Sequence, residues 1–301
     1  MNSAVQLSGL SREIAGVVER VGGRVVAVNG GNRRGASGIH WRPGVIVTAE
    51  SALERDEDLS VTLPGGREVA ASLAGRDPST DVAVLRFTAE GLPSAEVGDA
   101  SDLRAGHFAL AVGNYGSGAT ASLGIVGFAG GAWESMRGGL IDGLIRLDLN
   151  LSASAEGGAV ADAEGRVVGM AVFGPHRRVL VIPARTIDRV IDPLLAKGRI
   201  PRGYLGAGLQ RVELPAPAGA KDAKGRRGLL VVSIDPNAPA SAAGLRVGDI
   251  VLTWNGTALR RVRELMRQLG PESVGRKIEL GLIRGDAPLT LSVVLGERPA
   301  G

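Results

Sequence analysis

Residues 147–170 read LDLNLSASAEGGAVADAEGRVVGM: a strand-like apolar run, a loop of small residues, and two further strand-like runs. The segment 162–165 predicts a hairpin turn. Small residues and paired glycines let a backbone direct its N–H groups at a ligand, which is how an oxyanion hole is built. Glu156 stands directly before the two glycines, where its charge would repel an anion. The stretch therefore predicts a β-rich fold containing an unusual loop.

Similar short apolar runs recur between residues 24 and 182, bounded by Gly, Pro, Asp or Asn. This rhythm is typical of β-barrels or sandwiches, and a second hairpin is indicated at 59–73 by its central Pro-Gly-Gly. The chain has 46 glycines but only 3% aromatic residues, a composition that also favours short strands and tight turns. The runs divide near residues 96–106. We expect a mainly β fold with two halves of similar size.

The segment 183–201 has apolar residues at helical spacing, so a helix is expected to end the strand-rich part. A surface loop is expected over 213–228, followed by strands, a helical pattern at 258–270 and two closing strands. We therefore expect two domains, 1–198 and 199–301. A short amphipathic helix is also expected over 11–21, docked on the first sheet.

The beginning of the chain has no basic start followed by an unbroken apolar run, which is the pattern of an export signal. We expect a cytoplasmic protein if Met1 is the natural start, and a periplasmic or envelope protein if the chain has been trimmed. No segment reaches the roughly 20 apolar residues needed to span a bilayer.

The charge of the chain is uneven. The formal net charge is +4, and from residue 199 onward 16 Lys and Arg face 9 Asp and Glu. Nucleic-acid binding is the weakest hypothesis, because few aromatic residues are available there to stack on bases. The absence of cysteine excludes disulfides and thiolate nucleophiles, and we expect neither a cofactor nor a metal.

Five segments resemble, in the same order, motifs of the trypsin-like HtrA (DegP-type) proteases with a C-terminal PDZ domain. These segments are ASGIHWRPGVIVTAESAL (36–53), GRDPSTDVAVLRF (75–87), AVGNYGSGATASLGIVG (111–127), the opening stretch (147–170), and RGYLGAGLQ with APASAAGLRVGDIVLTWNG (202–210 and 238–256). The resemblance implies a trypsin-like double β-barrel followed by a PDZ domain of the α+β class. Members of this family are often trimers, but this N-terminus lacks the aromatic residues expected for such contacts, so a homo-oligomer stays an open hypothesis.

The resemblance also assigns the three catalytic roles. The aspartate of the family falls on Asp81, but its histidine falls on Ser51 and its nucleophilic serine on Glu156. A serine protease needs a hydroxyl, an imidazole to take its proton and a carboxylate to orient the imidazole. We therefore expect a degenerate triad in which no catalytic set is intact, with Ser154, Ala155 and Gly157 forming the loop of the former oxyanion hole.

Other side chains are poor substitutes for the missing groups. The resemblance places the three histidines, His40, His107 and His176, away from the catalytic corner. Ser152 and Ser154 lie near Glu156, but a serine hydroxyl without a base stays protonated and weakly nucleophilic.

The role of Glu156 is left open. It fills the vacated site by bonding to Ser51 or to backbone N–H groups, or it approaches Asp81 to form a carboxylate pair that shares a proton, binds a cation or acts as acid and base.

The PDZ-like part matches its family in its binding residues. A PDZ domain offers backbone N–H groups to the terminal carboxylate of a peptide, which then adds as a strand to a sheet edge. The resemblance implies that this site is made by two sets of residues, the carboxylate loop with its edge strand and the helix wall: Tyr204, Leu205, Gly206, Ala207, Gly208 and Leu209, with Leu265 and Leu269. Arg202 and the arginines of the helix at 260–269 favour acidic peptides.

We therefore interpret the chain as a catalytically inactive relative of the HtrA proteases that binds peptide or protein C-termini as an adaptor, scaffold or regulator. The alternative is an active HtrA-like serine endopeptidase in protein quality control.

Overall fold

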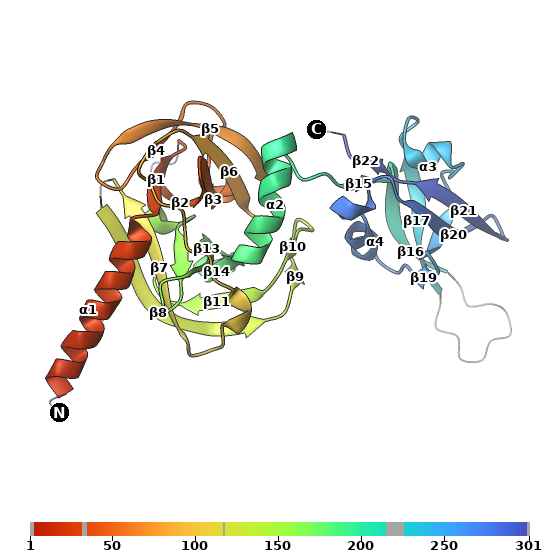
Figure 1. The fold of residues 1–301 in the computed structure, drawn as a ribbon. Coiled ribbons are helices and arrows are strands. Elements are labelled where there is room, and N and C mark those ends of the chain that lie inside the picture. Colours follow the sequence, from red (N-terminus) through yellow and green to blue (C-terminus); the bar gives the residue numbers. More distant parts are fainter. Residues whose placement is uncertain (1–2, 32–34, 117, 215–225, 300–301) are drawn as a thin grey trace. The chain divides into compact units, whose positions relative to one another are not determined.

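The computed structural model describes residues 3–31, 35–116, 118–214 and 226–299. The chain forms two compact units, Met1–Ile200 and Pro201–Gly301. Each unit is described by itself below, with the elements labelled as in Figure 1.

The first unit contains two closed six-stranded antiparallel barrels among its described residues. The first barrel runs in the order β1-β2-β3-β6-β5-β4. Its strands are β1 (Val25–Asn29), β2 (Ala36–Arg42), β3 (Val45–Ala49), β4 (Leu59–Thr62), β5 (Glu68–Asp77) and β6 (Val82–Phe87).

The second barrel runs in the order β11-β14-β13-β12-β7-β8. Its strands are β7 (Phe108–Tyr115), β8 (Gly118–Gly130), β11 (Leu144–Asp148), β12 (Ala159–Ala161), β13 (Val167–Phe173) and β14 (Val179–Pro183), and a small hairpin of β9 (Trp133–Glu134) and β10 (Leu140–Ile141) lies between β8 and β11 in the chain. The predicted mainly β fold with two trypsin-like barrels and a PDZ domain is confirmed.

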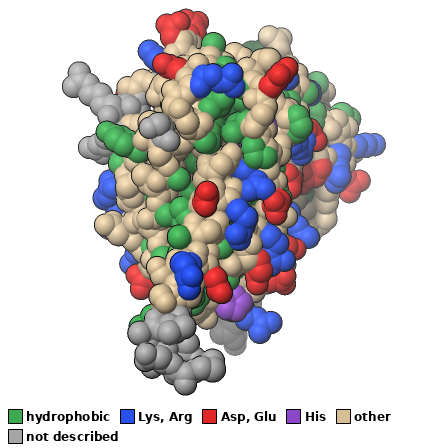
Figure 2. Space-filling view, turned by 60° about the vertical axis from the view of Figure 1, so that its left-hand side comes forward, with side chains coloured by type: hydrophobic (Ala, Val, Ile, Leu, Met, Phe, Trp, Pro, Cys, Tyr) green, Lys and Arg blue, Asp and Glu red, His purple; other side chains and the backbone are tan. Residues whose placement is uncertain are grey.

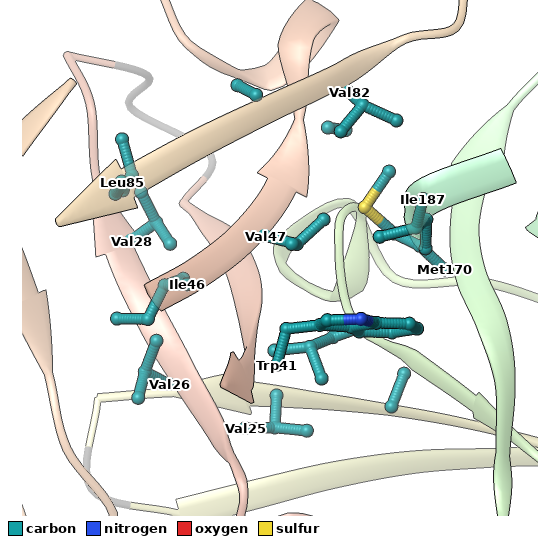
Figure 3. Packing of buried hydrophobic residues seen from close by; sticks show 14 of the residues in the cluster. Val25, Val26, Val28, Trp41, Ile46, Val47, Val82, Leu85, Met170 and Ile187 are labelled. Atoms are coloured by element: carbon teal, nitrogen blue, oxygen red, sulfur yellow. The ribbon is translucent and has the colours of Figure 1, made fainter. Parts of the chain in front are cut away.

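One apolar core continues from the first barrel into the second. Trp41 of β2 is 3% exposed and lies in this core beside Met170 of β13 and Ile187 of the helix α2 (Ala184–Lys197), as Figure 3 shows. The indole Nε1 of Trp41 donates a hydrogen bond of 2.7 Å to Asp188. Fully burying side chains of this size stabilises a fold by roughly 1.5–3 kcal/mol each, so α2 is a structural part of the first unit.

The N-terminal helix differs from its predicted form. Helix α1 spans Ser3–Gly22 and so begins well before the expected residue 11. Its C-terminal end packs chiefly on β7 and β8 of the second barrel rather than on the first sheet, and Val17 and Val21 are buried there. The earlier start has a physical reason: Leu7 and Leu10 continue the helical spacing but stay exposed, so residues 7–10 owe little to packing.

The second unit is built around an antiparallel sheet in the order β16-β17-β18-β20-β21, with β19 paired to β18. Its strands are β15 (Gly203–Tyr204), β16 (Ala207–Leu214), β17 (Arg226–Ile234), β18 (Ile250–Trp254), β19 (Thr257–Ala258), β20 (Lys277–Arg284), β21 (Ala287–Val294) and β22 (Gly296–Glu297), and its helices are α3 (Pro239–Ala242) and α4 (Val262–Gln268). Residues 215–225 of the predicted 213–228 loop lie outside the described residues.

No helix among the described residues is long and apolar enough to cross a membrane. On the face drawn in Figure 2, basic and acidic side chains lie interspersed.

Candidate functional site

Ser51 and Asp81 meet at the end of the first barrel. Ser51 lies in a single 3₁₀ turn that follows β3, and Asp81 lies in the turn between β5 and β6 with a φ of 58°. The carboxylate of Asp81 accepts two hydrogen bonds from Ser51, one from its backbone N–H at 2.8 Å and one from its hydroxyl at 3.1 Å. Ser51 is thus held where the resemblance expects the imidazole.

Glu156 reaches the same place from the second barrel. It follows the 3₁₀ turn Ala153–Ala155, and its Oε1 lies 3.5 Å from the hydroxyl of Ser51 and 3.4 Å from the backbone N–H of Phe173. The structure therefore brings together Ser51, Asp81 and Glu156, which are far apart in sequence. The hydroxyl of Ser51 bridges the two carboxylates and has only one proton to donate to them.

Both carboxyl groups at this site are perturbed. Burial raises the pKa of Asp81 to about 6, and the nearby charge of Glu156 also raises it. The two hydrogen bonds from Ser51 act in the opposite direction. Burial also raises the pKa of Glu156, while the Phe173 N–H, the Ser51 hydroxyl and the charge of Arg177 act in the opposite direction. Burial favours the protonated forms of both carboxyl groups, and so does the charge of one carboxylate on its neighbour.

The backbone donors of the loop around Glu156 are bonded within the loop or to β13. The N–H groups of Ala155, Glu156, Gly157 and Gly158 donate to backbone carbonyls at 3.1, 3.3, 2.8 and 3.0 Å. The hydroxyl of Ser37 also ties the loop by donating to the carbonyl of Ser154 at 2.6 Å. An oxyanion hole needs donors directed at the developing charge, and these four N–H groups are directed elsewhere.

Gly157 adopts a backbone conformation that this loop requires. Its φ is +81°, and a Cβ built on it would lie 2.4 Å from the Ser37 carbonyl oxygen and 2.6 Å from the Thr48 hydroxyl. Only glycine fits this close approach between the two barrels.

The three histidines lie elsewhere. His40 is buried in β2 with its Nδ1 2.9 Å from the carbonyl of Pro93, and His107 and His176 are exposed. Within the part of the chain that the structure describes, no hydrogen bond joins a histidine to Ser51, Asp81 or Glu156. The described residues also contain no cluster of three or more His, Cys, Asp or Glu suited to a metal ion.

A groove of about 360 Å³ lies in the second unit between β16 and α4. All eight residues predicted for peptide binding line it, together with Arg202, Gly203, Ser233, Asp235, Val262, Met266 and Arg298. Val262 and Met266 belong to the same helical pattern as Leu269 and could have been found from it. Asp235 and Arg298 come from distant segments, and no sequence signal connects them to the groove.

The loop that precedes β16 is tightly held. The carbonyls of Leu205 and Gly206 accept hydrogen bonds of 2.9 Å from the N–H groups of Ala240 and Asp235. The hydroxyl of Tyr204 donates to Asp235 at 3.0 Å. Gly206 has a φ of +73°, and a Cβ there would lie 2.0 Å from the Cβ of Ala238, so the loop requires glycine at this position.

Family comparisons agree with this architecture. Residues 36–170 match the trypsin-like peptidase domain, and residues 203–295 match the PDZ domain. The chain is HtrA/DegP-like. It combines the trypsin-like serine protease fold with a C-terminal PDZ domain.

Curated HtrA/DegP-like relatives extend beyond this chain. A probable periplasmic serine endoprotease DegP-like of Bartonella henselae is 33% identical over 267 residues, which cover 85% of this chain and 52% of that protein. The periplasmic pH-dependent serine endoprotease DegQ of Escherichia coli K12 is 31% identical and covers 85% and 58%, respectively. The chain thus spans about half the length of these relatives.

Two solved protease structures share the fold over nearly the whole chain. The serine endoprotease from Yersinia pestis is 27% identical with a TM-score of 0.73, covering 94% of this chain and 97% of its own. The HtrA-type protease AlgW with a decapeptide is 24% identical with a TM-score of 0.74, covering 95% and 99%, a likeness in fold alone.

Proposed function

We propose that this protein is a noncatalytic member of the HtrA/DegP-like group that binds peptide or protein C-termini as an adaptor, scaffold or regulator. The observation that carries the proposal is the hydroxyl of Ser51, bridging Asp81 at 3.1 Å and Glu156 at 3.5 Å where a triad needs an imidazole and a nucleophile. Ser51, Asp81 and Glu156 are then a degenerate triad.

Three features of the site around Ser51 and Glu156 oppose turnover. A hydroxyl hydrogen-bonded to carboxylates has no imidazole to carry its proton to a leaving group. The backbone N–H of Glu156, which an oxyanion hole would use, donates to Ala153. The carboxylate of Glu156, when ionised, also repels the anion of a tetrahedral intermediate.

The binding half of the proposal rests on the groove between β16 and α4. Its apolar helix wall and glycine-containing loop suit an extended peptide that pairs with β16 and places its terminal carboxylate at 204–207. The HtrA-type protease AlgW has also been solved with a tripeptide, at 26% identity to this chain, which supports peptide binding by this chain.

The second candidate function is an active serine endopeptidase engaged in protein quality control. The names of the relatives favour this function, because the relatives are named serine endoproteases. These names fit an active endopeptidase better than a noncatalytic protein. It requires a base and a nucleophile other than the residues at the triad positions.

The same relatives are named periplasmic. We therefore assign this protein to the periplasm rather than to the cytoplasm, as part of the proposal. A homo-oligomer stays compatible with it.

A fluorophosphonate probe, which reacts with activated serines, tests the proposal. We expect no labelling of the wild-type protein, whereas a dansyl peptide with a free C-terminus binds and its C-terminally amidated twin does not. Covalent labelling, which persists after the protein is denatured, would support the endopeptidase instead if the replacement of a single serine in the chain abolished it.

A further inference from the structure

The hydroxyl of Ser51 lies between two carboxyl groups that come from different barrels. Its oxygen is 3.1 Å from Oδ2 of Asp81, in the first barrel, and 3.5 Å from Oε1 of Glu156, in the second. A hydroxyl donates one hydrogen bond and accepts up to two, whereas an ionised carboxylate only accepts. When both carboxyl groups are ionised, one of these two contacts therefore has no hydrogen in it and brings two acceptors together.

One additional proton completes both contacts. When Asp81 carries it, that carboxyl donates to the Ser51 oxygen, and the Ser51 hydroxyl donates to Glu156. When Glu156 carries it, the direction of both hydrogen bonds is reversed. Either arrangement is a continuous hydrogen-bonded chain with one negative charge, so the proton belongs to the pair rather than to one residue. Two neighbouring carboxyl groups retain such a proton because each charge disfavours the other.

The charges on the first-barrel side favour retention of this proton. Burial is the main cause of the raised pKa of Asp81, and the charges of Glu156 and Glu50 add to it. The carboxylate of Glu50 is itself paired, with Arg76 at 3.2 Å and with Arg137 at 3.6 Å. These two arginines are therefore engaged with Glu50 rather than with the shared site.

On the second-barrel side, a cation acts on Glu156. Burial raises the pKa of Glu156, while the charge of Arg177 acts in the opposite direction. Phe173 contacts both groups, because its N–H lies 3.4 Å from Oε1 of Glu156 and the guanidinium of Arg177 lies 4.3 Å from the centre of its ring. The neighbouring His176 is exposed. An ionised Glu156 is therefore repelled by Asp81 and attracted by Arg177.

We propose that Asp81 and Glu156 share one proton through Ser51, and that this proton holds the two barrels together at this point. The contact is closed while the pair holds the proton, and it loosens when the proton is lost as the pH rises. The loop at 153–158 is then released from the first barrel on this side, because Glu156 directly follows its 3₁₀ turn. This shared proton is independent of the proposed peptide binding in the second unit.

An NMR titration of the full-length chain tests the sharing. The backbone N–H groups of Ser51 and Phe173 donate to Asp81 and Glu156, respectively. In the wild type we expect both amide signals to shift with a common upper midpoint, although the two residues belong to different barrels. Glu156→Gln is expected to lower the midpoint seen at Ser51, and Asp81→Asn the midpoint seen at Phe173, each by about one pH unit, because either charge makes the other carboxyl harder to ionise.

A charge outside the site provides the control. Glu90→Gln removes one negative charge from an exposed position and is expected to leave both midpoints unchanged. Because the coupling is reciprocal, either site variant tests it alone if the other fails to fold. Separate midpoints for Ser51 and Phe173 that neither site variant changes would overturn the sharing of a proton.

Hydrogen exchange followed by mass spectrometry tests the loosening of the contact. The amide of Glu156→Gln donates at any pH, so it stands in for the protonated carboxyl. At about pH 8 we expect residues 152–158 to exchange about threefold faster in the wild type than in Glu156→Gln, and at about pH 5 equally fast. Equal exchange at both pH values would show that the proton does not hold the barrels together. That result would leave the proposed function standing, because peptide binding is measured in the second unit.

Discussion

The two candidate sites of this chain differ in what each retains. Around Glu156, the loop keeps its glycine conformation and its hydrogen bonds to the first barrel, but the side chains at the triad positions are not the ones that acyl transfer needs. In the groove of the second unit, loop, strand edge and helix wall all suit peptide binding. A scaffold and its chemistry are therefore specified by different residues, so the fold alone does not carry the activity.

The largest expected effect is on the scaffold of the first site. Gly157→Ala places a Cβ against backbone and against the Thr48 hydroxyl at a φ of +81°, and we expect a loss of about 3–5 kcal/mol of unfolding free energy. Urea unfolding measures it. Gly91→Ala is the matched control, because Gly91 has the same φ of +81° with nothing within 4 Å of the added Cβ, and it is expected to cost only about 1–2 kcal/mol. Equal losses would show that the loop is not packed as described.

The next largest effect is on binding in the second unit. Gly206→Ala forces a Cβ onto Ala238 and distorts the carboxylate loop, and we expect peptide affinity to fall at least about tenfold. Gly244→Ala, with a φ of +79° and open space around the new Cβ, is the control and is expected to leave affinity unchanged. Unaltered binding by Gly206→Ala would place the ligand outside this groove.

A pH titration sharpens the contrast between the sites. Burial raises the pKa of Asp81 to about 6 in the folded protein, above the value near 3.9 expected in the unfolded chain. The folded state therefore binds more protons between these values, and stability is greatest below about pH 4 for this group and declines as pH rises through 6. We expect a decline of about 3 kcal/mol, because each unit of pKa difference between the folded and unfolded states corresponds to about 1.4 kcal/mol, and urea unfolding measures it.

Asp81→Asn is expected to flatten this decline, because an amide does not titrate. Asp102→Asn, at an exposed position, is the control and keeps it. The described burial of this carboxyl would be contradicted if the unfolding free energy of the wild type rose from pH 4 to 7 and Asp81→Asn showed the same pH profile.

The smallest effect is expected at Ser51. Ser51→Ala removes the hydroxyl bridge, but the backbone N–H of residue 51 still donates to Asp81 at 2.8 Å. Because Ser51 is exposed, the change in unfolding free energy at pH 7 is expected to stay within about 1 kcal/mol. A loss of several kcal/mol would show that the bridge is a major structural contact of the first unit.

Much of this architecture follows from local patterns in the sequence. Apolar runs bounded by turn residues indicate the strands of both barrels, and the Gly157-Gly158 pair indicates a tight loop. What could not be predicted depends on contacts between distant segments. Ser37 reaches Ser154 across 117 positions and fixes the loop, and Arg298 joins the groove only through the pairing of β22 with β15.

Digestion of casein, followed by mass spectrometry of the products, decides whether the first unit is catalytic. Three proteins are compared: the wild type, Glu156→Ala, and the double variant Ser51→His with Glu156→Ser. We expect no cleavage by the wild type or by Glu156→Ala. We expect only weak cleavage by the double variant, because the N–H groups of residues 155–158 stay bonded to backbone carbonyls, and adding Asp81→Asn abolishes this weak cleavage. Cleavage by the wild type that persists in Glu156→Ala would contradict the proposed loss of catalysis.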